Sequence, residues 1–234
     1  MARIGKQAAV KPRKAQRSIG RPSDPAHIVG RDALVAAACE LLKTMPPNEV
    51  SGVKIARQCS ADPSLIRYYF KDRMGLLTAA AEKLTTEFNP GAAVQAAGAR
   101  ASDQFRARMG RLLELDSANP FFHRLMLEEL MPSDEAPAKE LVANLAHRGV
   151  AAYNNILAHG HETGELGQVN PEMLFVSIVG ICQSFDNAYR LYEVATGRTL
   201  AREEFLDQYK KFIGELLLNG VAARPISPAK AITL

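Results

Sequence analysis

One short segment of the sequence combines the side chain types that bind nucleic acids. It reads SADPSLIRYYF over residues 60–70, and Lys71 and Arg73 follow directly. Arginine can donate two parallel hydrogen bonds to guanine or to phosphate, whereas tyrosine and lysine donate to phosphate oxygens. Three cations and two adjacent tyrosines within residues 67–73 therefore form a candidate DNA-binding surface. The alternative is a surface helix whose tyrosines pack against neighbouring elements.

This segment is predicted to be a short helix. Asp62 can cap its first turn, where Pro63 costs nothing because the missing N–H would be unpaired anyway. Ile66 and Phe70 lie four residues apart and share one face, which we expect to be buried. Residues 67–69 then point outward or sideways, where they could contact a major groove or its phosphates.

A second short helix is predicted directly before this one. Ser51 begins it, and it covers Val53–Cys59. A turn of three or four residues separates the two helices, which is the arrangement of a helix-turn-helix. A longer helix is predicted upstream, starting at Asp24–Pro25 and ending at the prolines of residues 46–48. Its apolar stripe consists of Leu34, Ala38, Leu41 and Met45.

The charge of the chain is unevenly distributed. Residues 1–21 contain seven lysines and arginines and no acid, although the whole chain has a formal net charge of only +4. Such a basic arm is either an electrostatic handle for nucleic acid or a disordered solubilising leader. We expect residues 1–22 to be disordered, because they lack apolar periodicity.

The remainder of the chain is predicted to be helical. Asp72 can cap a fourth helix that reaches Phe88, and no alternating β pattern follows it. The later helices are expected near residues 92–117, 120–131, 136–161, 171–196 and 202–220. The last two have wide apolar faces, which can be buried within one subunit or against a partner. Residues 224–234 are expected to be a flexible tail.

No catalytic or metal-binding constellation is predicted. The chain contains no GxSxG, HExxH, P-loop or GxGxxG pattern, and the two histidines of His159-Gly160-His161 make a weak metal signal. Its three cysteines are far apart and are expected to be buried apolar residues. No apolar run approaches the length of a membrane span, and no secretory signal is recognisable. We therefore expect a cytoplasmic protein without a cofactor and without enzymatic activity.

The N-terminal motifs resemble the DNA-binding domain of the tetracycline-repressor-like (TetR) family. The resemblance covers residues 25–85, through Val53-Lys54-Ile55-Ala56, Ala61–Phe70, Lys71-Asp72-Arg73 and Leu76-Leu77. It implies an all-α homodimeric regulator without catalytic activity. Its domains would be a helix-turn-helix domain over residues 23–72 and a helical effector-binding and dimerisation domain over residues 73–223.

The resemblance also implies which residues contact DNA. The family commonly has glycine where this chain has Ser60, and Arg67 stands where a different hydrogen-bond donor often contacts DNA. Arg73 stands where a phosphate-binding lysine is common, and the basic arm resembles minor-groove arms. The predicted DNA contacts are Arg17, Arg21, Lys54, Pro63, Ser64, Leu65, Arg67, Tyr68, Tyr69, Lys71 and Arg73.

The C-terminal domain is expected to bind a small hydrophobic or amphipathic effector. The candidate contacts are Phe121, Phe122, Leu125, Met126, Tyr153, Cys182, Phe185, Asp186 and Tyr189. Asp186 lies on an otherwise apolar helix, so it could anchor a cationic ligand or pair with Arg190 one turn later. Residues 171–196 and 202–220 would form the dimer interface.

The predicted function is a homodimeric repressor that leaves a near-palindromic operator when the effector binds. The effector would act by shifting the helix near 92–117 against the helix before it. A ligand-independent structural DNA-binding protein would share the same N-terminal features. A helical enzyme would require a catalytic cluster assembled only by the fold.

Overall fold

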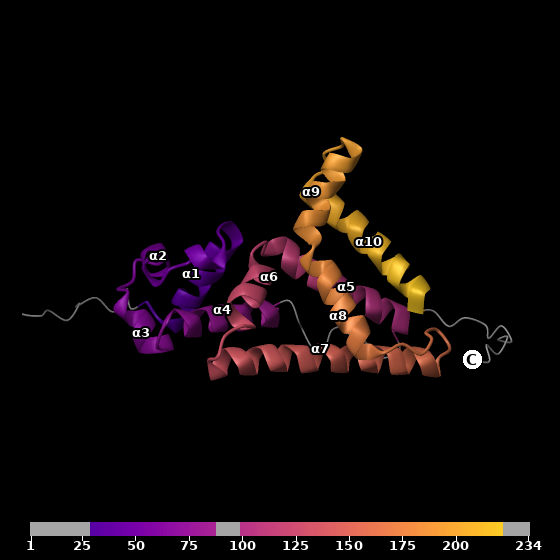
Figure 1. Ribbon diagram of the computed structural model, residues 1–234, viewed down its shortest axis with the longest axis horizontal. Helices are drawn as coiled ribbons and strands as arrows, with labels where there is room; N and C mark the ends of the chain where they lie inside the picture. Colours follow the sequence, from indigo (N-terminus) through magenta and orange to yellow (C-terminus); the bar gives the residue numbers. More distant parts are fainter. Residues whose placement is uncertain (1–28, 88–98, 222–234) are drawn as a thin grey trace, which may run out of the picture.

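The computed structural model describes residues 29–87 and 99–221, and every regular element within these ranges is a helix. The all-α prediction is therefore confirmed. Helices α1–α4 lie at one end of an elongated molecule, and α8–α10 lie at the other (Figure 1). The long helix α7 runs beside both groups, so it connects the two ends mechanically.

The N-terminal helices agree with the sequence except at the start of the first. They are α1 (Arg31–Thr44), the 3₁₀ turn η2 (Pro47–Glu49), α2 (Gly52–Gln58), α3 (Ser64–Phe70) and α4 (Arg73–Glu87). The predicted start at Asp24–Pro25 lies outside the described residues. Gly30 precedes α1 in an extended conformation, so this helix begins at Arg31.

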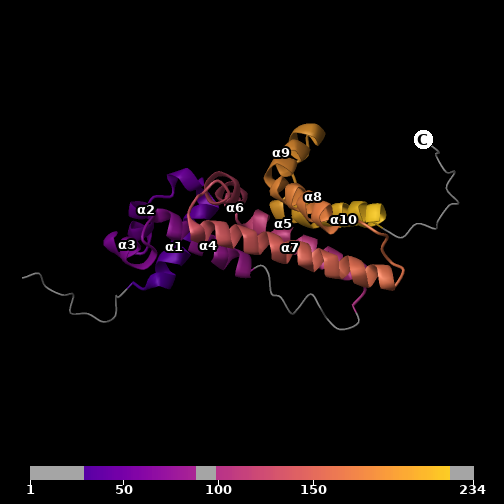
Figure 2. The ribbon, with the colours of Figure 1, turned by 60° about the horizontal axis from the view of Figure 1, so that its bottom comes forward.

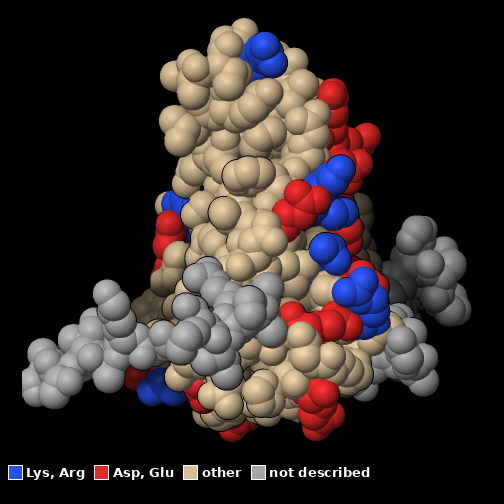
Figure 3. Space-filling model, turned by 90° about the vertical axis from the view of Figure 1, so that its right-hand side faces the viewer, with Lys and Arg blue, Asp and Glu red and all other residues tan. Residues whose placement is uncertain are grey.

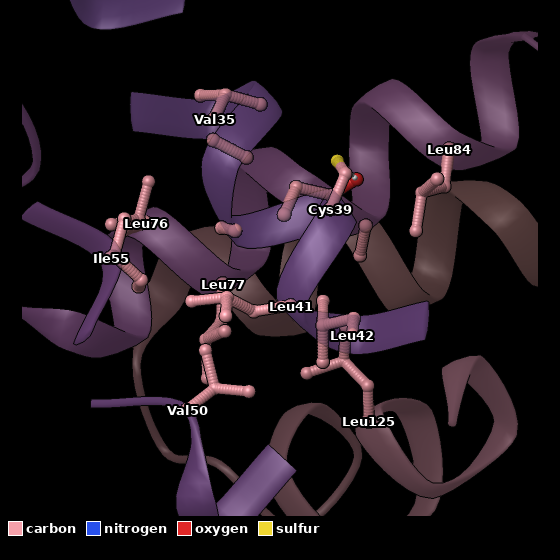
Figure 4. Packing of buried hydrophobic residues seen from close by; sticks show 14 of the residues in the cluster. Val35, Cys39, Leu41, Leu42, Val50, Ile55, Leu76, Leu77, Leu84 and Leu125 are labelled. Carbon is pink, nitrogen blue, oxygen red and sulfur yellow. Dashed lines mark hydrogen bonds between the residues drawn. The ribbon is translucent and has the colours of Figure 1, made fainter. Parts of the chain in front are cut away.

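The N-terminal core joins these helices to the first part of the following domain. It contains the buried apolar side chains of α1–α4 together with Val50, Leu115, Phe122, Leu125, Leu130, Ala138 and Leu141. Figure 4 shows Leu125 facing Leu42 of α1, Val50 below Leu77, and Ile55 beside Leu76. Each fully buried aliphatic side chain contributes roughly 1.5–3 kcal/mol. Because α4 belongs to this core, the packing does not divide at residue 72.

The C-terminal helices differ from the sequence prediction at the start of α5, in the geometry of residues 125–130 and at Ser184. They are α5 (Ala101–Ala118), α6 (Phe122–Arg124), the π-helical segment η3 (Leu125–Leu130), α7 (Ala136–Glu162), α8 (Pro171–Gln183), α9 (Phe185–Thr196) and α10 (Arg202–Val221). The expected single helix over 120–131 is thus a helical turn followed by a π-helix. The expected helix over 171–196 is broken at Ser184, whose hydroxyl donates to the Gly180 carbonyl at 2.9 Å.

Helix α5 is the centre of the second domain. It packs against α7, α8 and α10, and Figure 2 shows it among these helices. The C-terminal core contains Phe105, Met109 and Leu113 of α5, Tyr153 of α7, Ile178 of α8 and the buried apolar side chains around them. Helix α7 therefore contributes to both cores, with Leu141 in the first and Tyr153 in the second.

Helices α9 and α10 are held together by aromatic rings. The ring of Phe205 on α10 lies 5.2–5.7 Å, between ring centroids, from the rings of Phe185, Tyr189 and Tyr192 on α9. Such ring pairs contribute about 0.5–1.5 kcal/mol each beyond their buried area. These rings therefore join α9 to the first part of α10, and α10 also packs along α5 (Figure 1).

Asp186 closes the same contact between α9 and α10. Its Oδ1 accepts from Arg202 Nη2 at 2.5 Å, and this guanidinium also donates to the Ser117 carbonyl at 3.1 Å. Asp186 thus pairs with Arg202 and not with Arg190, which was one of its two alternatives in the sequence analysis. Asp186 stands in the first turn of α9 and faces the first turn of α10, which a rule based on one helix could not identify.

Candidate DNA-binding and effector sites

The helix α3 is built as the local sequence predicts. Asp62 Oδ1 accepts from the Ser64 backbone N–H at 2.8 Å, and hydrogen bonding to the Ser64 side chain and backbone lowers the pKa of Asp62. Ile66 and Phe70 are buried in the N-terminal core, as expected from their spacing. Pro63 and Ser64 are exposed at the start of the helix, and Leu65 is half-buried.

The opposite side of α3 presents polar side chains to solvent. Arg67 and Lys71 are exposed, and Tyr68 is 77% exposed. Tyr69 is half-buried, because its ring packs against the N-terminal core and lies 4.9 Å from the Tyr68 ring. Arg67 and Tyr68 are therefore free to reach a groove, whereas Tyr69 can offer only the edge of its side chain.

One left-handed residue before α3 and one close contact after it set how α3 lies against its neighbours. Ser60, in the turn between α2 and α3, has φ 54° and so adopts the left-handed conformation that glycine prefers. At the other end, a Cβ on Gly75 would lie 2.2 Å from the Phe70 carbonyl oxygen. Helix α4 can therefore approach the end of α3 only because residue 75 has no side chain.

Arg73 does not present its charge to solvent as predicted. Its guanidinium donates to both carboxylate oxygens of Glu129 at 3.0 and 2.9 Å. It also donates to the backbone carbonyls of Val50, at 2.7 Å, and Pro47. Because these bonds direct the guanidinium into the protein, Arg73 is not free to make the phosphate contact that the sequence predicted. It joins η2 and α4 to η3 instead.

The neighbouring helix α2 adds a cation, Arg57, that the sequence prediction missed. The predicted Lys54 is exposed and lies 3.8 Å from Glu49, and Arg57 is exposed one turn further along the same face. Their three-residue spacing on one helix could have indicated the pair. An open groove between α2 and α3 is lined by Val53, Arg67 and Tyr68, among others. The predicted contacts Arg17 and Arg21 lie outside the described residues.

The predicted effector contacts fall into two separate groups. Phe122, Leu125 and Met126 belong to the N-terminal core, and Phe121 is adjacent to them and half-buried. Tyr153, Cys182, Phe185 and Tyr189 belong to the C-terminal core. Asp186 is held by Arg202. The residues proposed from the sequence thus do not line one shared pocket, because α6 and η3 pack their apolar side chains into the N-terminal core.

The C-terminal half of the chain matches a known family. Residues 100–226 match the model described as "Tetracyclin repressor-like, C-terminal domain".

The chain belongs to the tetracycline-repressor-like (TetR) family.

Solved structures share the fold of this TetR-family protein. A TetR/AcrR-family transcriptional regulator from Thermobifida fusca has 23% identity and a TM-score of 0.59, and the match covers 81% of this chain and 97% of that chain. FadR from Bacillus subtilis, in complex with stearoyl-CoA, has 16% identity, a TM-score of 0.63 and coverages of 82% and 100%. AibR, in complex with isovaleryl coenzyme A and operator DNA, has 17% identity, a TM-score of 0.60 and coverages of 78% and 96%. No curated protein sequence matches the chain.

The TetR-type C-terminal domain contains polar atoms that are buried without partners. Among the described residues, Asp116 Oδ1 and Asn119 Oδ1 at the end of α5 accept no hydrogen bond. Burial, and to a lesser degree the charge of Asp186, raise the pKa of Asp116 to about 7. Arg108 Nε and the Tyr153 hydroxyl form a second unpaired set, closer to the middle of α5 and α7. These positions are candidates for ligand contacts that the apolar pattern of the sequence did not reveal.

The same domain exposes large apolar side chains. Met173 and Val176 of α8 are 68% and 64% exposed, and Phe212 and Leu216 of α10 are 61% and 55% exposed. Figure 3 shows a broad uncharged band at this end of the molecule, bordered on one side by charged residues. Within the described ranges, no helix is both long and apolar enough to cross a membrane.

Proposed function

We propose that this TetR-family protein is a homodimeric repressor that leaves its operator when a small effector binds. The observation that carries the proposal is the exposed polar side of α3, with Arg67 and Tyr68 in solvent beside a buried side held in the N-terminal core. A dimer would place two α3 helices in successive major grooves, about 34–36 Å apart, on a near-palindromic site. Lys54, Arg57 and Lys71 would add phosphate contacts.

The exposed faces of α8 and α10 support the dimer. Both helices pack against α5 on one side, so their other sides face outward. The exposed side chains Val176 and Phe212 are too large and apolar to remain in water without cost. A Cβ on Gly180 would meet no atom within 4 Å, so another helix could approach α8 closely there. Two copies would bury these faces against each other as a four-helix interface.

The effector signal would pass to the DNA-binding helices through η3 and α7. Helix α4 packs against α1, α3, α7 and η3, and the Arg73–Glu129 ion pair joins the start of α4 to η3. This route replaces the expected direct shift of α5 against α4. π-Helical turns occur frequently at functional sites. The extra residue in such a turn can move along the helix when the helix shifts. An effector bound beside α5 and α7 would change operator affinity by its preference for one arrangement of this connection.

The effector class is suggested by two proteins of the same fold. FadR and AibR were solved with stearoyl-CoA and isovaleryl coenzyme A, respectively. Both ligands combine an apolar acyl group with a phosphorylated carrier. The C-terminal core of this chain is apolar and aromatic, which fits the acyl group. We therefore propose an acyl-coenzyme A effector, and as a DNA-bound regulator the protein would act in the cytoplasm.

The test is a titration of the full chain against DNA fragments flanking its own gene at two salt concentrations. We expect selective binding with a steep salt dependence. Arg67→Ala should cost roughly 1–3 kcal/mol and relax the sequence preference. Lys211→Ala, on α10, is the matched control and should leave binding unchanged. Equal and weak binding of all fragments would refute the proposal.

A second measurement separates a sensor from a ligand-independent DNA-binding protein. The protein–operator complex is titrated with isovaleryl-CoA and stearoyl-CoA, and the retained DNA is quantified by fluorescence anisotropy. A sensor releases DNA at a ligand concentration that also raises the melting temperature of the free protein. A protein that binds its operator but neither releases it nor changes its melting temperature with either thioester would not respond to this effector class.

A further inference from the structure

Three arginines lie together on α5 and α7 with no acidic partner among residues 29–87 and 99–221. Arg108 and Arg111 are three residues apart on α5, and Arg148 is on α7. Among the described residues none of the three forms an ion pair, and the one hydrogen bond of their guanidinium groups joins Arg148 Nε to the Asn144 carbonyl at 3.4 Å. The segments outside the described ranges contain a single acidic side chain, Asp24.

Arg108 is the most constrained of the three. Its guanidinium carbon lies 5.3 Å from the centroid of the Tyr153 ring, and its Nε is buried with no hydrogen-bond acceptor in the part of the chain that the structure describes. Burial lowers the pKa of Arg108, and repulsion from Arg111 and Arg148 contributes in the same direction. A guanidinium cannot lose its charge in a protein, and the described residues supply no counter-ion for this cluster.

The aromatic side chains beside this cluster form an apolar wall. Tyr153 has no exposed surface, and its hydroxyl has no partner within the described part of the chain. Its ring lies 5.8 Å from Phe105 and 6.4 Å from Phe175. Phe175 in turn covers Gly149, where a Cβ would lie 2.3 Å from its ring. One site therefore places three cations next to an aromatic interior.

We propose that Arg108, Arg111 and Arg148 bind the phosphate groups of the effector, and that its acyl group extends along Tyr153 and Phe175. Three guanidinium groups suit a ligand with several phosphates, because each can donate in parallel to two oxygens. A coenzyme A thioester supplies both the phosphates and the apolar arm. This assignment rests on the proposed effector class, and it locates that effector between α5 and α7.

The test measures ligand binding directly, without DNA. Isothermal titration of the full-length protein uses isovaleryl-CoA, stearoyl-CoA below its micellar concentration, free coenzyme A, ATP and stearate. We expect at least one thioester to bind more tightly than free coenzyme A, and its affinity to fall with added salt. If stearate binds as well as stearoyl-CoA, the phosphates contribute nothing and the proposal fails. If ATP binds as tightly as the thioesters, the acyl group contributes nothing to binding, and its proposed place along Tyr153 and Phe175 is refuted.

Variants of the cluster identify the residues. Arg111→Gln and Arg148→Gln, at accessible positions, should each weaken thioester binding about tenfold. Arg108→Lys keeps the positive charge but loses the paired N–H donors of the guanidinium, and it should weaken thioester binding by a similar factor. Arg106→Gln is the matched control, since Arg106 is an exposed cation on the same helix and should leave affinity unchanged. Unchanged affinity in the cluster variants, or an equal loss in the control, would overturn the assignment.

Tyr153→Phe is a variant of the site that should remain folded, so a loss of ligand binding in it cannot be attributed to misfolding. This variant removes an unpaired buried hydroxyl, so the free protein should melt at the same or a higher temperature. The thioester should nevertheless bind more weakly if the hydroxyl meets the ligand. A variant with unchanged affinity would remove Tyr153 from the site.

Operator titrations of the same variants separate this assignment from the proposed repressor function. If the arginine variants lose operator affinity in the absence of ligand, the cluster serves DNA rather than the effector. If the wild-type protein binds a thioester in an arginine-dependent manner but binds no DNA fragment, the effector site stands and the repressor function fails.

Discussion

The ion pair between Arg73 and Glu129 should be a principal link between the two domains. Its two nearly equal N–H···O distances, 3.0 and 2.9 Å, indicate a bidentate contact, and the two side chains are only 31% and 16% exposed. Charge-assisted hydrogen bonds of this kind contribute about 1.5–3 kcal/mol each when shielded from water. Partial exposure places this pair near the lower limit.

Arg73→Met should lower the free energy of unfolding by about 3 kcal/mol. It leaves the Glu129 carboxylate unpaired and removes the donors to the carbonyls of Val50 and Pro47. Glu129→Gln keeps one acceptor and should cost about 1–2 kcal/mol. The double variant should show a coupling energy of about 1–2 kcal/mol, because the second change removes a group already left without its partner.

The assay is urea denaturation followed by far-ultraviolet circular dichroism, with operator affinity measured on the same samples. The single variants should bind DNA more weakly, because η2 and η3 no longer hold the start of α4 in one position. The exposed pair Lys83–Glu87 is the control, and its cycle should give a much smaller coupling energy. A coupling energy for Arg73 and Glu129 within about 0.3 kcal/mol of zero would refute the reasoning.

Three further predictions follow from single residues. Ser60→Gly should raise the free energy of unfolding by about 0.5–1 kcal/mol in the same assay, because φ 54° is strained for serine and natural for glycine. Asp116 has a pKa of about 7 in the folded protein and 3.8 as its ordinary value, so folding takes up a proton between these values and stability falls as pH rises from 4 to 7. Asp116→Asn should reduce that fall by on the order of 2–4 kcal/mol between denaturation curves at pH 4 and pH 8, and an unchanged pH profile would contradict it. Val176→Asp should convert the dimer to a monomer in analytical ultracentrifugation, whereas Glu172→Gln on the same helix should not.

The sequence predicted α3 correctly, because all its signals are local. Asp62, Pro63 and the four-residue spacing of Ile66 and Phe70 lie within nine residues, and the helix follows from them. The tilt of Tyr69 towards the core could not be predicted in the same way. It depends on how α3 lies against the other helices, which its own residues do not specify.

The roles of charged residues were harder to predict, because their partners lie far apart in the sequence. Arg73 is a plausible phosphate ligand until Glu129, 56 residues later, is placed beside it. Arg108 and Arg148 look like ordinary surface cations until α5 and α7 pack together. Asp186 illustrates the converse error, since the local partner was available but the distant Arg202 lies closer.

The length of α7 has a consequence for operator recognition. Its 27 residues make a rod about 40 Å long, with the arginine and aromatic residues near its middle and the DNA-binding domain packed at its N-terminal end. A rod of this length acts as a lever. A tilt of about 5° about its C-terminal end moves its N-terminal end, beside the DNA-binding domain, by about 3.5 Å. That displacement is close to the rise of about 3.4 Å between successive base pairs. A side-chain-sized adjustment around the effector could thus shift each reading helix by one step along the DNA.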